Sequence, residues 1–94
     1  MTIQRKYIKK GHIFTIELPE NPSTGYSWNA EWTQGLKVIE DKYVASQNDQ
    51  IGAPGRHIWR IKAKKNGLQF FNACYQQSWG DNYAETYELI VKVF

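Results

Sequence analysis

The sequence predicts an all-β protein, an antiparallel sandwich of about seven strands. Apolar and polar residues alternate with a period of two over much of the 94-residue chain, as they do in strands that bury one face. Clusters of Gly, Pro, Asn and Ser separate these segments at the spacing typical of antiparallel sheets, and no stretch leaves room for a helix of three turns. A sandwich is favoured over a barrel because its loops then gather at two ends.

Four strands follow from alternation alone. Their apolar positions are Phe14, Ile16 and Leu18; Tyr26, Trp28, Ala30 and Trp32; Trp59, Ile61 and Ala63; and Tyr87, Leu89, Val91 and Val93. Segments 36–44 and 68–76 are predicted as strands because they are rich in Val, Ile, Phe and Tyr. Residues 2–8 are expected to add an edge. Tyr26 and Trp28 should point into the core with Phe14 and Trp59, whereas Trp32 fits either core or rim.

Two connections have distinct compositions. Lys64-Lys65-Asn66-Gly67 predicts a tight hairpin between the fifth and sixth strands, because Asn-Gly supplies the positive φ that a type I′ turn requires. Residues 21–25 form a longer loop with a proline, two hydroxyls and a glycine. We expect this loop to have a fixed shape and to turn its polar groups to solvent, as recognition loops do.

Length and charge limit the possible functions. The chain is expected to form one domain over residues 1–94, since its size supports a single core. Twelve Lys and Arg against nine Asp and Glu give a net charge of +3, which is small for a dedicated nucleic-acid binder. The pairs Lys9-Lys10 and Lys64-Lys65 are interpreted as solvated turn flanks.

Targeting signals are also missing from the sequence. The N-terminal residues interrupt each short apolar stretch with charge, unlike a signal peptide, and no segment approaches the length of a membrane span. We expect a soluble protein, either cytoplasmic or the mature form of a secreted or periplasmic one.

Catalytic groups are scarce. Cys74 is the single cysteine, which excludes an internal disulfide and every multi-cysteine metal site; we interpret it as a small residue of a sheet. His12 and His57 lack metal-ligand spacing and are expected at the surface or at an edge. An acyl-transfer enzyme needs a nucleophile beside an oriented base, so we predict no enzyme, no metal and no cofactor.

Residues 21–28 read NPSTGYSW and resemble the Asn-Pro-Thr-Thr-Gly-Tyr/Phe signature of the chagasin family, whose members inhibit papain-like cysteine peptidases. Two further loops follow in the family's order. Gly52-Ala53-Pro54-Gly55 stands where the family has Gly-x-Gly-Gly, and Gln77-Ser78-Trp79 stands where it has Arg-Pro-Trp. The resemblance extends from Gly11 to Val93. The departures are Pro54 and the Gln77-Ser78 pair, and loss of an arginine at the rim is expected to weaken or narrow inhibition by about 1 to 2 kcal/mol.

The resemblance implies an immunoglobulin-like sandwich whose three loops lie at one end and block a peptidase cleft. Inhibition would be reversible and non-covalent, by a monomer. Pro22 to Thr24 would lie nearest the catalytic Cys and His of the target, Gly52 to Gly55 along the substrate-binding backbone, and Trp79, which we expect to be exposed, at the rim. The implied contact residues are Asn21, Pro22, Ser23, Thr24, Gly25, Gly52, Ala53, Pro54, Gly55, Gln77, Ser78 and Trp79.

The residues support this mode independently. A proline-stiffened loop on a rigid sheet withholds its carbonyls from attack geometry at low entropic cost, and Trp is a frequent binding anchor. Asn21 and Gly25 are expected to build the turn itself. One alternative is a carbohydrate- or cell-surface-binding sandwich, with Trp79, Tyr83 and Tyr43 stacking on sugar rings. Another is a structural module without a peptidase target.

Overall fold

The computed structural model of the protein describes residues 2–45, 55–77 and 83–94, and it is built from seven β-strands and one short helical turn. The strands are β1 (Thr2–Ile8), β2 (Ile13–Glu20), β3 (Tyr26–Trp32), β4 (Leu36–Val44), β5 (Gly55–Ala63), β6 (Gly67–Gln77) and β7 (Tyr83–Val93), and the 3₁₀ turn η1 is Pro22–Thr24. Every segment predicted as a strand is one. The helical turn is far shorter than a membrane span, and no described helix reaches that length.

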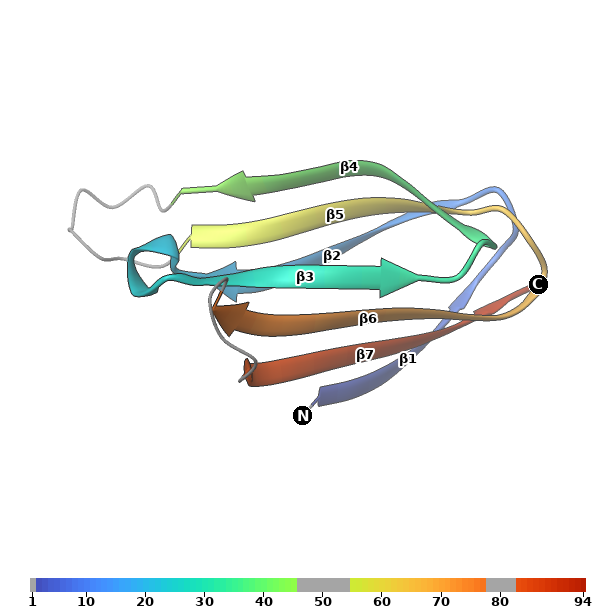
Figure 1. The fold of residues 1–94 in the computed structure, drawn as a ribbon. Coiled ribbons are helices and arrows are strands. Elements are labelled where there is room, and N and C mark those ends of the chain that lie inside the picture. Colours follow the sequence, from blue (N-terminus) through green and yellow to red (C-terminus); the bar gives the residue numbers. More distant parts are fainter. Residues whose placement is uncertain (1, 46–54, 78–82) are drawn as a thin grey trace.

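Two sheets stack to form the sandwich (Figure 1), which confirms the predicted fold class. One sheet has the strand order β1-β7-β6-β3 and the other has the order β2-β5-β4. The strand β1 is the expected edge strand, and it runs parallel to β7, whereas the other pairs are antiparallel.

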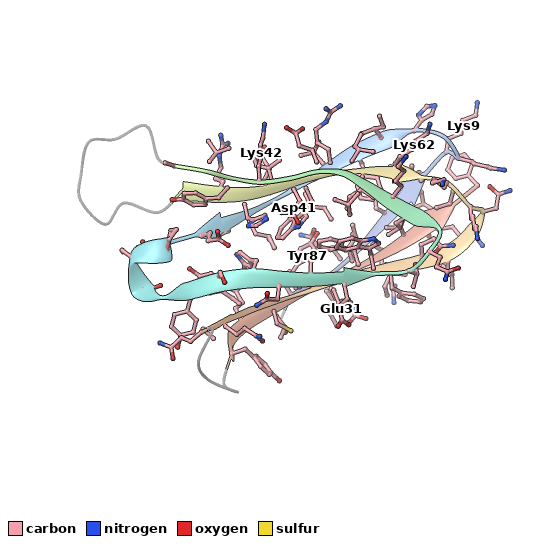
Figure 2. The ribbon with its side chains drawn as sticks, turned by 45° about the horizontal axis from the view of Figure 1, so that its top comes forward. Lys9, Glu31, Asp41, Lys42, Lys62 and Tyr87 are labelled. Carbon is pink, nitrogen blue, oxygen red and sulfur yellow. The ribbon has the colours of Figure 1, made fainter. Side chains whose placement is uncertain are left out.

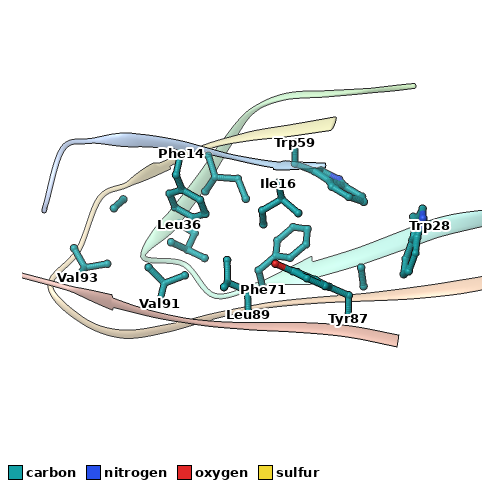
Figure 3. Packing of buried hydrophobic residues seen from close by; sticks show 13 residues of the cluster. Phe14, Ile16, Trp28, Leu36, Trp59, Phe71, Tyr87, Leu89, Val91 and Val93 are labelled. Atoms are coloured by element: carbon teal, nitrogen blue, oxygen red, sulfur yellow. The ribbon is translucent and has the colours of Figure 1, made fainter. Parts of the chain in front are cut away.

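The core lies between the sheets and is rich in aromatic side chains. Trp59 of β5 and Phe71 of β6 are nearly inaccessible to solvent, and their rings meet edge to face with centroids 5.2 Å apart. Figure 3 shows Phe14, Ile16 and Trp59 of one sheet opposite Phe71 and Leu89 of the other. Such edge-to-face pairs add to the free energy of area burial, so the alternating apolar positions read from the sequence are the ones that join the two layers.

The expectation for Tyr26 is wrong, whereas that for Trp28 is confirmed. Trp28 belongs to the buried cluster with Phe14 and Trp59. Tyr26 is half-buried outside that cluster and stacks on Tyr75 instead, because it stands at the very start of β3, beyond the covered part of the sheet. Trp32, at the opposite end of β3, is 41% exposed and stacks on Phe71, so it lies at the rim.

The prediction of a tight hairpin at residues 64–67 is also wrong. β5 pairs with β2 and β4 on its two sides, so the chain must cross to the other sheet to form β6. Gly67 has a positive φ of 103°, but Asn66 does not, which excludes a type I′ turn. The amides of Lys64 and Lys65 instead donate to the carbonyl of Gly35, which holds the crossing against the turn before β4.

Burial of Tyr87 predicts a loss of stability in alkali. Its phenol donates to Gln4 Oε1 at 3.0 Å, and burial raises the pKa of Tyr87 above its ordinary value. The unfolded chain therefore ionises this phenol first, so its contribution to stability is complete below about pH 10 and is lost as the pH rises through the raised pKa. Urea unfolding on both sides of about pH 10 should show a smaller alkaline loss for Tyr87→Phe than for the wild type. Tyr7→Phe, at a position 75% exposed, should behave as the wild type; equal losses in all three proteins would contradict the assignment.

Candidate protein-binding loops

The strand ends that lead into the three loops of interest meet at one end of the sandwich. In the sheet that contains β2, Glu20 pairs with Gly55, and Val44 pairs with Arg56. In the other sheet, Tyr26 pairs with Gln77. Figure 1 shows η1, the end of β4 and the end of β6 on the same side of the molecule, opposite the C-terminus.

Residues 21–25 form a turn that is closed by its own polar groups. Asn21 caps η1, and its Oδ1 accepts hydrogen bonds from the amide of Ser23 at 3.3 Å and from Ser23 Oγ at 2.6 Å. Gly25 ends the turn with φ of 81°, a left-handed conformation that glycine adopts without strain, and its amide donates to the carbonyl of Pro22. The expected turn-building roles of Asn21 and Gly25 are thus confirmed.

Both hydroxyls of the turn are used within it. Thr24 Oγ1 donates to the carbonyl of Asn21 at 2.7 Å and accepts from the amide of Tyr26, while Ser23 Oγ is bound to Asn21. The side chains of Pro22, Ser23 and Thr24 are nevertheless exposed. The loop therefore presents a small proline-hydroxyl surface of fixed shape.

Tyr75 connects this turn to β6. Its phenol oxygen accepts a hydrogen bond from the amide of Asn21 at 2.9 Å. Its ring stacks on Tyr26 and packs against Trp28, with centroids 5.4 and 4.9 Å away. Because Tyr75 lies two residues before the end of β6, the same side chain supports the first loop and the strand that leads into the third.

Below the turn, Glu20 joins the two sheets. Its side chain is 6% exposed, and Oε2 accepts from the amide of Trp28 at 2.9 Å across the sandwich. The indole Nε1 of Trp28 donates to the carbonyl of Pro19 at 2.8 Å. The two ends of the first loop are therefore fastened together by one buried carboxylate and one buried indole.

His57 completes this network, which corrects its expected placement at the surface. The imidazole is 14% exposed and stacks on Trp59 at 4.2 Å; Nδ1 faces Glu20 Oε2 at 3.1 Å, and Nε2 faces Asp41 Oδ1. Asp41 reaches the inner face because β4 contains a bulge between Val38 and Glu40. Among the described residues, no group of three ligand-type side chains has the arrangement of a metal site.

Gly55, at the start of β5, is buried and has no space for a side chain. A Cβ atom there would collide with the carbonyl oxygen of Val44 and with the ring of Tyr43. The second loop therefore returns to the sheet through a position that only glycine fits.

The predicted contact residues divide into two groups. Residues 21–25, Gly55 and Gln77 are described, and Gln77, the last residue of β6, is half-exposed. Gly52, Ala53, Pro54, Ser78 and Trp79 lie outside the described residues.

Sequence reasoning missed Glu20, Asp41 and His57 as supports of the loop end. Two of them carried a signal. Glu20 is an even number of residues from the buried Phe14, so its side chain points to the same, inner face of β2. His57 stands in the same relation to the buried Trp59 on β5. A charged residue in phase with a core is buried only when it is paired, so both positions predict partners. Asp41 carried none, because the bulge changes the phase of β4.

Comparisons with known proteins point in the same direction. Residues 7–91 match the sequence model of the chagasin family peptidase inhibitors. Chagasin of Trypanosoma cruzi is 28% identical over 75 residues, covering 73% of this chain and 68% of the relative. Amoebiasin-1 of Entamoeba histolytica is 32% identical over 77 residues, covering 80% of this chain and 74% of the relative.

Two solved structures have the same fold. The cysteine protease inhibitor EhICP2 from Entamoeba histolytica superposes with a TM-score of 0.89 at 22% identity, covering 99% of this chain and 88% of its own. PbICP-C, solved in complex with falcipain-2, superposes with a TM-score of 0.69 at 22% identity, covering 99% of this chain and 91% of its own.

The β-sandwich, the capped turn at residues 21–25 and the match to the family's sequence model together identify this protein as an inhibitor of peptidases and not an enzyme. Within that class, the chain belongs to the chagasin family.

Removing the Glu20 carboxylate should destabilise the fold. Glu20→Ala leaves the amide of Trp28 buried without its acceptor, so we expect the free energy of unfolding to fall by about 1 to 3 kcal/mol. Glu17→Ala is the matched control, since Glu17 lies on the same strand and makes only an exposed ion pair with Arg56; it should cost below about 1 kcal/mol. Urea unfolding measures both variants, and equal losses would contradict the bridging role.

Removing the Tyr75 hydroxyl should loosen the first loop locally. In Tyr75→Phe the amide of Asn21 loses its acceptor, so its hydrogen exchange should accelerate about tenfold. Amides in the middle of β6 should keep their protection. Unchanged exchange at Asn21, measured by NMR, would show that Tyr75 does not hold the loop.

Proposed function

We propose that this protein is a reversible, non-covalent inhibitor of papain-like cysteine peptidases, and that the loop end of the sandwich enters the active-site cleft. Membership of the chagasin family supports the class of activity, and the structure of PbICP-C in complex with falcipain-2 shows a protein of the same fold bound to a partner. The rigid turn at residues 21–25 is the observation that carries the mode of binding.

The hydrogen bonds of the turn explain how such an inhibitor would resist cleavage. A cysteine peptidase attacks the carbonyl carbon of a peptide that is held in a reactive geometry. Here the carbonyl of Asn21 accepts from Thr24, and the carbonyl of Pro22 accepts from the amide of Gly25 at 3.0 Å. A helical turn with two engaged carbonyls can fill the cleft next to the nucleophile without aligning as a substrate.

The supports below the turn would reduce the entropic cost of binding. Tyr75 and Trp28 hold the two ends of the loop before any partner arrives, so less freedom is lost on association. In this proposal Pro22, Ser23 and Thr24 make the central contacts. Residues 52–55 and 77–79 make the flanking ones, with Trp79 at the cleft rim.

Papain inhibition tests the proposal directly. Replacing Pro22, Ser23 and Thr24 together with Ala should weaken inhibition by about a hundredfold if this turn is a binding hot spot. Asn29→Ala combined with Glu31→Ala is the control, because both side chains are exposed and lie from the middle of β3 towards its far end, away from the loops. The control should inhibit like the wild type.

Three outcomes would overturn this mode. They are unchanged inhibition by the loop variant, a covalent adduct in intact-mass spectra, and failure of papain activity to return on dilution. A glycan array run beside the assay separates the sugar-binding alternative: inhibition that is lost in Trp79→Ala supports the peptidase target, whereas glycan binding without inhibition refutes it.

A further inference from the structure

The charges of this protein are separated along its length. We define the basic pole as residues 5–14, 33–38, 61–70 and 90–94, which form the end of the sandwich opposite the candidate loops. These segments contain nine of the twelve Lys and Arg residues and none of the nine Asp and Glu residues. The formal charge is therefore +9 on the basic pole and −6 on the remainder of the chain, although the net charge is only +3.

Backbone contacts bring the four segments together. The amide of Gly11 donates to the carbonyl of Ala63 at 2.7 Å, which places the Lys9-Lys10 turn beside the Lys64-Lys65 crossing. Lys62 pairs with both Ile13 and Lys37 across the smaller sheet. Figure 2 shows Lys9 and Lys62 at the end away from η1.

The cations of the basic pole are not neutralised by the protein. Lys42, Arg56 and Arg60, the three cations outside it, each make a salt bridge with Glu40 or Glu17. None of the nine cations of the basic pole makes a salt bridge within the described part of the chain, and all nine are exposed. An unneutralised concentration of like charge costs folding energy and attracts anions.

Exposed apolar side chains lie among these cations. Tyr7, Leu68 and Ile13 are 75%, 57% and 48% exposed. On the outer face of the larger sheet, Lys92 stands between Tyr7 and Leu68 in one row across three strands. A shallow groove of about 420 Å³ follows this face, with a lining that includes Arg5, Tyr7, Leu68, Phe70, Ile90 and Lys92.

We propose that the basic pole binds the surface of an anionic phospholipid membrane. Lysines near such a surface are attracted by its negative potential, and neighbouring apolar side chains insert at the boundary between headgroups and acyl chains. A single-stranded nucleic acid would stack bases on aromatic faces such as those of Tyr7 and Phe94, whereas a lipid layer also accommodates the exposed aliphatic side chains of Leu68 and Ile13. The turns at 9–12 and 64–66 lie beside each other at the same end of the sandwich (Figure 1), so a flat layer of lipid can meet both at once.

This orientation would leave the peptidase-binding end free. β6 is 11 residues long and runs from the basic pole to the candidate loops, which separates the two ends by about 35 Å. A protein that rests on a membrane by its basic pole would therefore point residues 21–25 away from the lipid. Membrane binding and peptidase inhibition are then compatible and separately testable.

Vesicle binding by two matched variants tests the proposal. Lys10→Gln, Lys64→Gln and Lys65→Gln together remove three charges from the basic pole, and Lys42→Gln, Arg56→Gln and Arg60→Gln together remove three from elsewhere. Both variants have a net charge of zero. The wild type should sediment with phosphatidylcholine vesicles only when these contain phosphatidylserine, and added salt should release it. The first variant should bind about a hundredfold more weakly and still inhibit papain, whereas the second should bind vesicles nearly as the wild type does.

A third variant distinguishes lipid from other polyanions. Tyr7→Ser with Leu68→Ser removes apolar contact and no charge, so it should weaken binding to the mixed vesicles and leave retention on heparin or duplex DNA unchanged. Wild-type binding to heparin or DNA without binding to the vesicles would overturn the proposal. Equal losses in the two matched charge variants would overturn it as well.

Discussion

One buried carboxylate holds the loop end of this sandwich together. Glu20 accepts a hydrogen bond from the backbone of Trp28, which belongs to the opposite sheet, and faces the ring of His57 on its own sheet. A charge removed from water is costly unless such partners satisfy it. The turn at 21–25 stands directly above these contacts, so its position relative to both sheets depends on them. An apolar residue at position 20 could fill the space but could not fix the two strands in register.

The two ends of the molecule differ in how their polar and charged groups are satisfied. Around the turn, hydrogen bonds engage Asn21, Ser23, Thr24, Tyr75 and Glu20. Ion pairs neutralise Lys42, Arg56 and Arg60. At the opposite end, the described lysines and several apolar side chains are exposed, and none of these lysines makes a salt bridge; Lys6 lies over the ring of Phe14. Between them, the aromatic core around Trp59 and Phe71 provides a rigid body. This arrangement allows either end to engage a partner without reshaping the other.

Much of the fold was predictable because alternation reports burial directly. The strands over residues 26–32 and 36–44 have the predicted bounds, and the turn-building roles of Asn21 and Gly25 followed from their residue types. Features that depend on pairing partners did not follow. The sequence of residues 64–67 resembles that of a hairpin turn. The segment crosses between the two sheets instead, because β5 already has a neighbouring strand on each side. His57 and Glu20 are 37 residues apart, so neither identifies the other in the sequence. The hydrogen bond from the amide of Asn21 to Tyr75 was unpredictable for the same reason, because the two residues are far apart in the sequence.

The smaller sheet also limits self-association. Its edge strands are β2 and β4, and an open edge is a template on which another chain could add a strand. Pro19 removes one backbone donor near the end of β2, and the bulge of β4 interrupts the regular ladder on the other side. Pro19 and the bulge each shorten the regular row of backbone groups on their edge. The distortion that carries Asp41 to His57 thus also makes the edge at β4 a poorer template for an added strand.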